Sequence, residues 1–264
     1  MKKLLAGAII FFLLLPGLIL AQETATYDED YTAPRCRLGT SPCLVPESLI
    51  NGRDNMAGGN EPNEPNTIST SPCPDGTSGG YHGDESLDSF SVIDLSGPKF
   101  SPGDTIKVEA VVYCFNTTDR LTVFSAPDAG NPSWTQMGDT PCTLSGSTET
   151  LEITFSLPAG DGNQVIRAAF TYGASSTACV TAGYNDRDDV IISVNDSDYD
   201  GMGDSWEDSN SCVDRNNRDS WLDPDNDGLT SMEEMDLGTD PCDPDTDGDG
   251  MDDLWEANNV TDPL

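Results

Sequence analysis

The stretch TIKVEAVVY (Thr105–Tyr113) decides the fold of this chain. Apolar residues take every second position in it, namely Ile106, Val108, Ala110 and Val112. Because successive side chains of a β-strand point to opposite faces of a sheet, this alternation indicates a strand with one buried face. The stretch LEITFSL (Leu151–Leu157) has the same pattern.

More segments of this kind occur upstream of residue 195, separated by turn-forming clusters such as Ser101-Pro102-Gly103-Asp104. They are Phe90–Leu95, Leu121–Ser125, Val165–Tyr172 and Val190–Val194. No segment between them has a helical period of useful length. Six or more strands in about 100 residues predict a mainly β fold, an antiparallel β-sandwich of the jelly-roll kind, over residues 71–194.

The N-terminus has the pattern of a secretory signal. Met1-Lys2-Lys3 is followed by an apolar run, Leu4–Leu20, and then by Ala21-Gln22. A transmembrane anchor is the alternative, but the run is short for a span of about 20 apolar residues and a Pro-Gly pair breaks it. We therefore expect residues 1–21 to be removed, leaving a secreted or cell-surface protein without a membrane span. We expect the Pro-, Asn- and Gly-rich residues 22–70 to wrap the sandwich as a disulfide-pinned coil.

Charge and cysteine content narrow the class of partner. The chain has 47 acidic and 12 basic residues, a formal charge of −35. Such a surface repels nucleic acid, so cations are the expected partners. Eight cysteines in an exported chain indicate up to four disulfides. No two of them form a Cys-x-x-Cys pair, so zinc binding and thioredoxin-like chemistry have no support.

The acidic residues are concentrated in the C-terminal 70 residues, 195–264. This tail holds 23 Asp and Glu against two Arg. Three windows in it share one twelve-residue spacing, with Asp at positions 1, 3 and 5, Gly at position 6 and Glu at position 12. The windows contain Asp196, Asp198, Asp200 and Glu207; Asp223, Asp225, Asp227 and Glu234; and Asp245, Asp247, Asp249 and Glu256.

This spacing supplies the six to eight hard oxygen ligands that Ca²⁺ requires. Position 7 offers a backbone carbonyl, and position 9 offers a direct or water-mediated ligand. These positions hold Met202 and Asp204, Leu229 and Ser231, and Met251 and Asp253. A disordered acidic tail is the alternative, but it does not explain why Gly and Glu recur at fixed offsets. We predict three calcium sites, with calcium ions as the cofactor.

The flanks of the windows indicate which calcium-binding fold to expect. The entries IISVN and RDSWL are strand- or coil-like, which argues against the paired helices of an EF-hand. With LGTDPCDPDTDGDGMDDLWE (Leu237–Glu256), residues 195–264 resemble the thrombospondin type 3 repeats of secreted bacterial proteins. The resemblance implies calcium binding, a Cys212–Cys242 cystine and an overlapping second register at Asp243-x-Asp245-x-Asp247-Gly248.

Residues 36–194 also have a resemblance, carried by CRLGTSPCLVPESLINGRD and TACVTAGYNDRDDVIISV. They resemble an uncharacterised sandwich module found beside secreted hydrolases of predatory and soil bacteria. Its cysteine pattern implies the bridges Cys36–Cys43, Cys73–Cys179 and Cys114–Cys142. More distantly, SPGDTIKVEAVVY and RDDVIISV are similar to jelly-roll carbohydrate-binding modules, in which acidic residues before the last strand commonly hold a structural calcium.

One loop has the pattern of a serine hydrolase. Gly76-Thr77-Ser78-Gly79-Gly80 fits G-x-S-x-G, and the only histidine of the chain, His82, follows it. A nucleophile elbow needs a strand before the serine and a helix after it, and the flanking residues, CPD and YHG, favour neither. An exposed loop also provides no oxyanion hole. We therefore predict a structural loop and no enzyme activity.

Two further features leave alternatives open. Acidic clusters precede the first and last long strands, at Asp75, Asp84, Glu85 and Asp88 and at Asp186, Asp188 and Asp189. They indicate either one more calcium in the Asp75, Glu85 and Asp189 region or a solvated rim that caps strand ends. Aromatic residues indicate either a sugar-stacking platform or a core position for the tryptophan; they are Trp134, Tyr81, Tyr113, Tyr172 and Tyr184.

The sequence thus favours a secreted, non-enzymatic, calcium-binding protein with a structural or adhesive role at or outside the cell surface. A carbohydrate- or surface-binding accessory module of a secreted hydrolase system is the alternative. The expected partners are calcium ions and a cell-surface protein or glycan, and nucleic acid is excluded.

Overall fold

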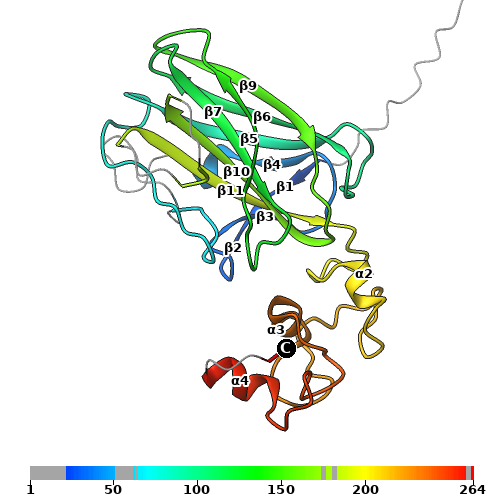
Figure 1. Ribbon diagram of the computed structural model, residues 1–264. Coiled ribbons are helices and arrows are strands. Elements are labelled where there is room, and N and C mark those ends of the chain that lie inside the picture. The colour runs from blue at the N-terminus through cyan, green and yellow to red at the C-terminus, as the bar shows by residue number, and fades with distance from the viewer. Residues whose placement is uncertain (1–21, 51–61, 63–64, 174–176, 180–182, 260–262) are drawn as a thin grey trace, which may run out of the picture.

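Two β-sheets face each other over an apolar core, and the acidic tail leaves one end of them (Figure 1). The computed structural model describes residues 22–50, 62, 65–173, 177–179, 183–259 and 263–264. The predicted signal, residues 1–21, lies outside the described residues. The chain is therefore mainly β, and its sheets pack as the predicted β-sandwich.

The first sheet has five strands in the order β1-β4-β5-β6-β9. The strands are β1 (Glu23–Thr24), β4 (Cys43–Val45), β5 (Ser86–Asp94), β6 (Thr105–Cys114) and β9 (Ser147–Ser156). β1 runs parallel to β4, and the other pairs are antiparallel.

The second sheet has six strands in the order β2-β3-β11-β10-β7-β8. They are β2 (Thr26–Asp28), β3 (Ala33–Cys36), β11 (Asn185–Val194), β10 (Gly162–Tyr172), β7 (Asp119–Ala126) and β8 (Thr135–Pro141). β3 runs parallel to β11, and the other pairs are antiparallel. Both sheets are therefore mixed, whereas the sequence predicted purely antiparallel pairing.

The alternation that indicated strands also places the core. Ile106, Val108, Ala110 and Val112 of β6 are all fully buried, whereas the residues between them are only partly covered. From the facing sheet, Ile166 and Phe170 of β10 and Ile192 of β11 pack against the same core. Burying each large apolar side chain contributes about 1.5–3 kcal/mol, so this shared layer holds the two sheets together.

The N-terminal segment differs from the expected coil. It contributes β1 to β4 and the short helix α1 (Glu47–Ile50), and it adds strands to both sheets. These strands are two to four residues long, too short to show a period of two in the sequence.

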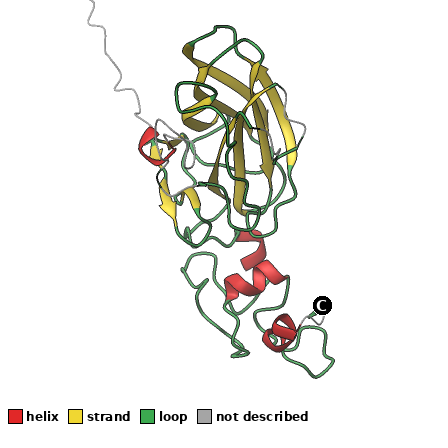
Figure 2. Ribbon diagram, turned by 90° about the vertical axis from the view of Figure 1, so that its left-hand side faces the viewer, coloured by secondary structure: helices red, strands yellow, loops and turns green. Residues whose placement is uncertain are grey.

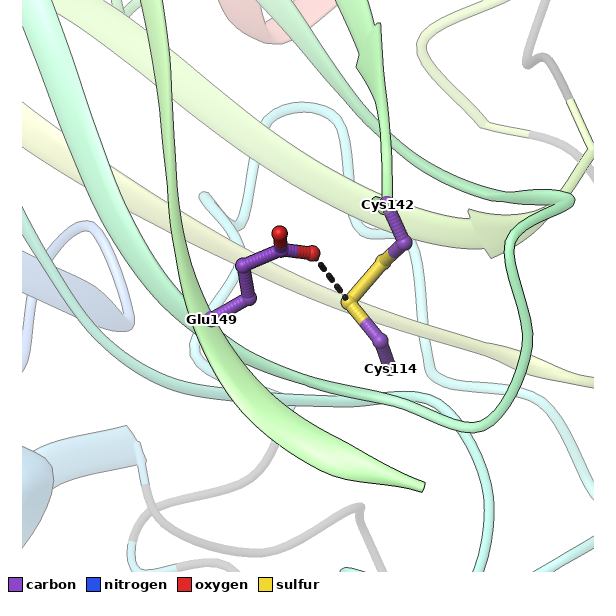
Figure 3. A group of neighbouring side chains, drawn as sticks. All are labelled: Cys114, Cys142 and Glu149. Atoms are coloured by element: carbon purple, nitrogen blue, oxygen red, sulfur yellow. Dashed lines mark hydrogen bonds between the residues drawn. A yellow bond between two sulfur atoms is a disulfide. The ribbon is translucent and has the colours of Figure 1, made fainter. Parts of the chain in front are cut away.

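Four disulfides pin the chain: Cys36–Cys43, Cys73–Cys179, Cys114–Cys142 and Cys212–Cys242. These are the pairings that the two resemblances imply. Figure 3 shows the third bridge, where Oε2 of Glu149 lies 3.4 Å from Sγ of Cys114. The same carboxylate accepts a hydrogen bond from the N–H of Thr143. Because both sulfurs are oxidised, this cluster is a covered cystine rather than a metal site.

The tail consists of loops and the short helices α2 (Asp204–Glu207), α3 (Ser231–Leu237) and α4 (Asp253–Asn259), visible below the strands in Figure 2. Its first part contacts the sandwich. Nδ2 of Asn195 donates to Oδ1 of Asp161 at 3.0 Å, and Nζ of Lys99 donates to the hydroxyl of Tyr199 at 2.7 Å. A Cβ at Gly203 would lie 2.4 Å from Cβ of Asp161, so only glycine permits this close approach.

Within the described chain, every helix is too short or too polar to cross a membrane.

Candidate metal sites

The three acidic windows fold into the same turn. Residues at position 4 (Tyr199, Asn226 and Gly248) have φ of 66°, 66° and 73°. Glycines at position 6 (Gly201, Gly228 and Gly250) have φ of 105°, 108° and 98°. Two left-handed residues per loop bend the backbone around a centre, and only glycine adopts the wider angle at position 6 readily.

The aspartates hold these turns through backbone hydrogen bonds. In the first loop, Oδ1 of Asp198 accepts from the N–H of Asp200 at 3.2 Å, and Oδ1 of Asp200 accepts from the N–H of Met202 at 3.0 Å. The bonds from positions 5 and 7 recur in the second loop, at Asp225 and Asp227, and in the third, at Asp247 and Asp249. The position-7 residues Leu229 and Met251 donate in the same way as Met202.

The turn brings the carboxylates together. In each loop, one oxygen from each of the three aspartates lies within 4.8 Å of the others, and the groups are Asp196, Asp198 and Asp200; Asp223, Asp225 and Asp227; and Asp245, Asp247 and Asp249. Burial raises the pKa of Asp198 to about 6, and repulsion from the neighbouring carboxylates of Asp200 and Asp196 adds to this effect. Near the first group, Nε of Arg218 donates to the backbone carbonyl of Asp198 at 2.7 Å.

The glutamate at position 12 of each loop lies in a short helix and is almost fully buried. Glu207, Glu234 and Glu256 lie in α2, α3 and α4 and are 2%, 0% and 1% exposed. Both carboxylate oxygens of Glu207 and of Glu234 are buried without a hydrogen-bond partner among the described residues. Burial, together with the nearby aspartates, raises the pKa of each to about 8. Carboxylates in this state lack a positive partner, and a divalent cation at the centre of the loop would provide one.

Two of the position-9 side chains, Asp204 and Asp253, form hydrogen bonds with position 2 of their own loops. Oδ1 and Oδ2 of Asp204 accept from the N–H and the hydroxyl of Ser197, both at 2.8 Å. Asp253 accepts the same pair of bonds from Thr246, at 3.0 and 2.8 Å. These bonds close the first and third loops, and a direct or water-mediated ligand role for position 9 stays a prediction.

The second loop has a different position 9, Ser231. Its hydroxyl donates to the carbonyl of Leu222 at 3.2 Å. Position 2 of this loop is Pro224, which has neither an N–H nor a hydroxyl to offer. A carboxylate at position 9 would find no donor there, which explains why serine stands in its place.

A carboxylate outside the predicted set joins the first site. Oxygens of Asp219, Asp200 and Glu207 lie within 4.8 Å of one another. Asp219 is 4% exposed, and its Oδ1 has no hydrogen-bond partner within the described chain. Asp219 lies outside all three twelve-residue windows, and the fold of the tail brings it to the first site.

Asp243 is not brought into the third group. It is exposed, and its Oδ1 accepts from the N–H of Asp245 at 3.4 Å. The overlapping register Asp243-x-Asp245-x-Asp247-Gly248 therefore stays a prediction.

The serine and the histidine of the hydrolase-like loop have different neighbours. The N–H of Ser78 donates to the carbonyl of Gly183 at 2.8 Å, and a Cβ at Gly183 would meet the Ser78 hydroxyl. His82 stacks between Tyr81 and Tyr113, and its Nε2 lies 2.8 Å from Oδ1 of Asp88. The loop is thus held by contacts with Gly183, Tyr113 and Asp88, and the lack of enzyme activity stays a prediction.

The two acidic clusters of the sandwich lie near each other, and a further calcium in the Asp75, Glu85 and Asp189 region stays a prediction. Oδ1 of Asp75 accepts from the N–H of Arg187 at 2.7 Å, and Asp189 is ion-paired with Arg167. Glu85 instead faces Asp119. These carboxylates are buried, so the expected solvated rim is wrong.

The predicted aromatic platform is divided among three places. Trp134 lies with its ring 4.3 Å from the guanidinium of Arg167, and its Nε1 donates to the hydroxyl of Ser71. Tyr81 and Tyr113 hold the histidine, and Tyr172 and Tyr184 line a hollow at the end of the sandwich. One continuous platform is therefore absent from the described surface.

Comparisons with known proteins show a distant likeness over part of the chain. The chain is similar to the C-terminal domain of wzt, with 10% identity and a TM-score of 0.31 over 42% of this chain and 72% of that one. It is also similar to a chitin binding domain from Burkholderia pseudomallei, with 10% identity and a TM-score of 0.26 over 36% of this chain and 55% of that one, about half of its length. No family model and no curated protein matches the sequence. These likenesses are too distant to indicate a function.

Proposed function

We propose that this protein is a secreted, non-enzymatic, calcium-binding protein whose tail folds around three calcium ions. The observation that carries the proposal is the pair of buried glutamates, Glu207 and Glu234, whose oxygens face clustered aspartates without a hydrogen-bond partner in the described chain. Hard oxygen ligands of this number and flexibility suit Ca²⁺ better than Mg²⁺, which requires near-ideal octahedral geometry.

The aspartates at positions 1, 3 and 5 and the glutamate at position 12 would hold each ion, with Asp219 added at the first. A bound ion supplies the positive charge that these carboxylates lack. The tail carries 23 acidic residues and few apolar ones, so without that charge its loops have little to fold around. Calcium would thus act as the core of the tail, as in the thrombospondin type 3 repeats that it resembles.

A structural or adhesive role follows from this arrangement. The first loop is hydrogen-bonded to the sandwich through Asn195 and Asp161, so an ion held there would fix the direction in which the tail leaves the sandwich. Extracellular calcium modules bind at about 10⁻⁴–10⁻³ M, which keeps such sites filled outside a cell. The alternative role, a carbohydrate- or surface-binding accessory module, stays a prediction.

Limited proteolysis of the mature protein tests the proposal. With millimolar calcium the tail should resist cleavage, and with EDTA it should be cut between residues 195 and 264 while the sandwich survives. Replacing both Asp225 and Asp227 by Ala should expose the second loop even in calcium. Replacing both Asp208 and Asp214 by Ala removes the same charge outside the three loops. This control should leave protection from the protease unchanged.

Equal digestion in calcium and EDTA would show that no ion orders the tail. Equal protection by magnesium and calcium would show that the sites are not calcium sites.

A further inference from the structure

A hollow of about 320 Å³ lies at the end of the sandwich opposite the tail. β11 begins beside it, at Asn185, and leads to the tail from its other end, at Val194. Six residues line the hollow: Asp84, Glu85, Phe115, Asn116, Tyr172 and Tyr184. Its volume is at the small end of the range for ligand sites, which suits a single head group.

Three of the lining side chains are exposed aromatics. Phe115 is 52% exposed, Tyr172 61% and Tyr184 46%. The N–H of Tyr172 donates to the carbonyl of Tyr184 at 3.2 Å, one step beyond the paired residues Thr171 and Asn185. Directly opposed residues of an antiparallel pair project to the same face, so the two tyrosines lie side by side.

Glu85 lines the hollow, and a second buried carboxyl group, that of Asp119, lies beside it. Glu85 precedes β5 of one sheet and is 1% exposed, and Asp119 begins β7 of the other sheet and is fully buried. The two carboxyl groups are near neighbours, and Oε2 of Glu85 and Oδ1 of Asp119 have no hydrogen-bond partner among the residues described. Burial, with Asp84 and Asp119 beside it, raises the pKa of Glu85 to about 9. A cation bound beside Glu85 would stabilise the ionised carboxylate and so lower this pKa, which links binding of a positively charged ligand to loss of the proton.

We propose that this hollow binds an organic ammonium group, with Phe115, Tyr172 and Tyr184 against its alkyl surface and Asp84 and Glu85 as its counter-charges. The electron-rich faces of aromatic rings attract a cation, and the effect grows where water is excluded. The proposal concerns the sandwich alone and is independent of calcium in the tail.

Charge complementarity selects this ligand over others. Two carboxyl groups line the hollow, and no Lys or Arg is among its described lining residues. A metal ion would use the carboxylates but not the rings. A neutral sugar would stack on the rings and form hydrogen bonds with the polar groups, but it would not neutralise the carboxylates. An ammonium group uses both features.

Titration of the mature protein with choline tests the proposal, and NMR or calorimetry measures the binding. Millimolar calcium is present throughout so that the tail stays in one state. The matched control ligand is 3,3-dimethyl-1-butanol, in which carbon replaces the charged nitrogen. Choline should bind saturably and more tightly than the neutral analogue. Tyr172→Leu should weaken choline binding by about five- to thirtyfold, the loss of one cation–π contact. Tyr172→Phe should keep it.

Glu85→Gln should weaken choline binding with little effect on the neutral analogue. Trp221→Leu, which removes an equally exposed aromatic in the tail, should change nothing. Because Glu85 is buried and its variant can misfold, Asp84→Asn at the rim provides a second charge test. The proposal is overturned if choline does not bind saturably, or if the neutral analogue binds as tightly. It is also overturned if calcium competes with choline for the hollow, or if a saccharide binds there and choline does not.

Discussion

The N–H of Asp219 donates to Oδ2 of Asp200 at 3.0 Å, across 19 residues of sequence. This bond holds the carboxylate of Asp219 beside Asp200 and Glu207, so the first site draws on a residue well outside its loop. Oδ2 of Asp227 in the second loop similarly accepts from the N–H of Leu254, at 3.0 Å. The aspartate at position 5 thus ties the first loop to the segment that precedes the second loop, and the second loop to the third.

Asp219→Asn should therefore weaken calcium binding at the first site by about tenfold, because affinity in such sites depends on the number of charged ligands. The other two sites should be unaffected. Terbium luminescence excited through Trp206 in α2 would follow the first site. The control is Asp214→Asn, in the same segment, whose side chain accepts only from Asn216 within the described residues. An unchanged first site in Asp219→Asn would exclude it as a ligand.

The role of position 9 can be separated from that of position 12. In the third loop, Asp253 accepts from Thr246, whereas Glu256 is buried at the base of the loop. Thr246→Val should lower local stability by about 1–3 kcal/mol and leave calcium affinity nearly unchanged, because the lost hydroxyl donates to Asp253 and accepts from the N–H of Asp240. Glu256→Gln should reduce the affinity strongly. If Asp253→Asn reduced affinity as much as Glu256→Gln, position 9 would be a direct ligand.

Much of the sandwich could be predicted because its long strands alternate in the sequence. All six predicted segments are strands, from β5 to β11. β8 was missed, since TQMGDTP is partly exposed along its length at a sheet edge and has no alternation to find. The strands of residues 22–50 were missed for their shortness.

In the tail, the fixed spacing predicted the aspartates and glutamates that the turns gather. Spacing reports only ligands within one loop, so it could not reveal Asp219, which tertiary folding supplies. It also could not show that Asp204 and Asp253 turn toward Ser197 and Thr246, because that depends on side-chain direction. A donor at position 2, present in the first and third loops and replaced by Pro224 in the second, was the available signal.

A buried ion pair stabilises the outer face of the six-stranded sheet. Nε and Nη2 of Arg167 donate to Oδ1 and Oδ2 of Asp189 at 2.7 and 2.8 Å, and both side chains are fully buried. Asp189→Ala should destabilise the protein by about 3–5 kcal/mol, because it leaves an uncompensated buried charge. Urea unfolding in calcium measures this.

The matched control for that pair is Glu109→Gln, which breaks the partly exposed pair with Lys107 and should cost at most about 1 kcal/mol. Similar losses in the two variants would mean that Arg167 finds other partners once Asp189 is removed.

The calcium-free tail should be more stable in acid than in base. The folded pKa of Glu207 and of Glu234 is about 8, above the ordinary value of 4.5. A carboxyl whose pKa is raised on folding favours the folded state fully below its unfolded pKa, and this contribution is lost as the pH rises through the folded pKa. In EDTA, protection of the tail from a pH-tolerant protease should therefore fall between about pH 5 and pH 8.

Calcium should reverse this dependence, because the ion binds the ionised carboxylates and is displaced by protons. With calcium present, protection should be high at pH 8 and lost in acid. Glu207→Gln with Glu234→Gln should flatten the profile measured in EDTA, since neither side chain can then ionise. A profile in EDTA that rises with pH, or one that the double substitution leaves intact, would show that other groups control the folding of the tail.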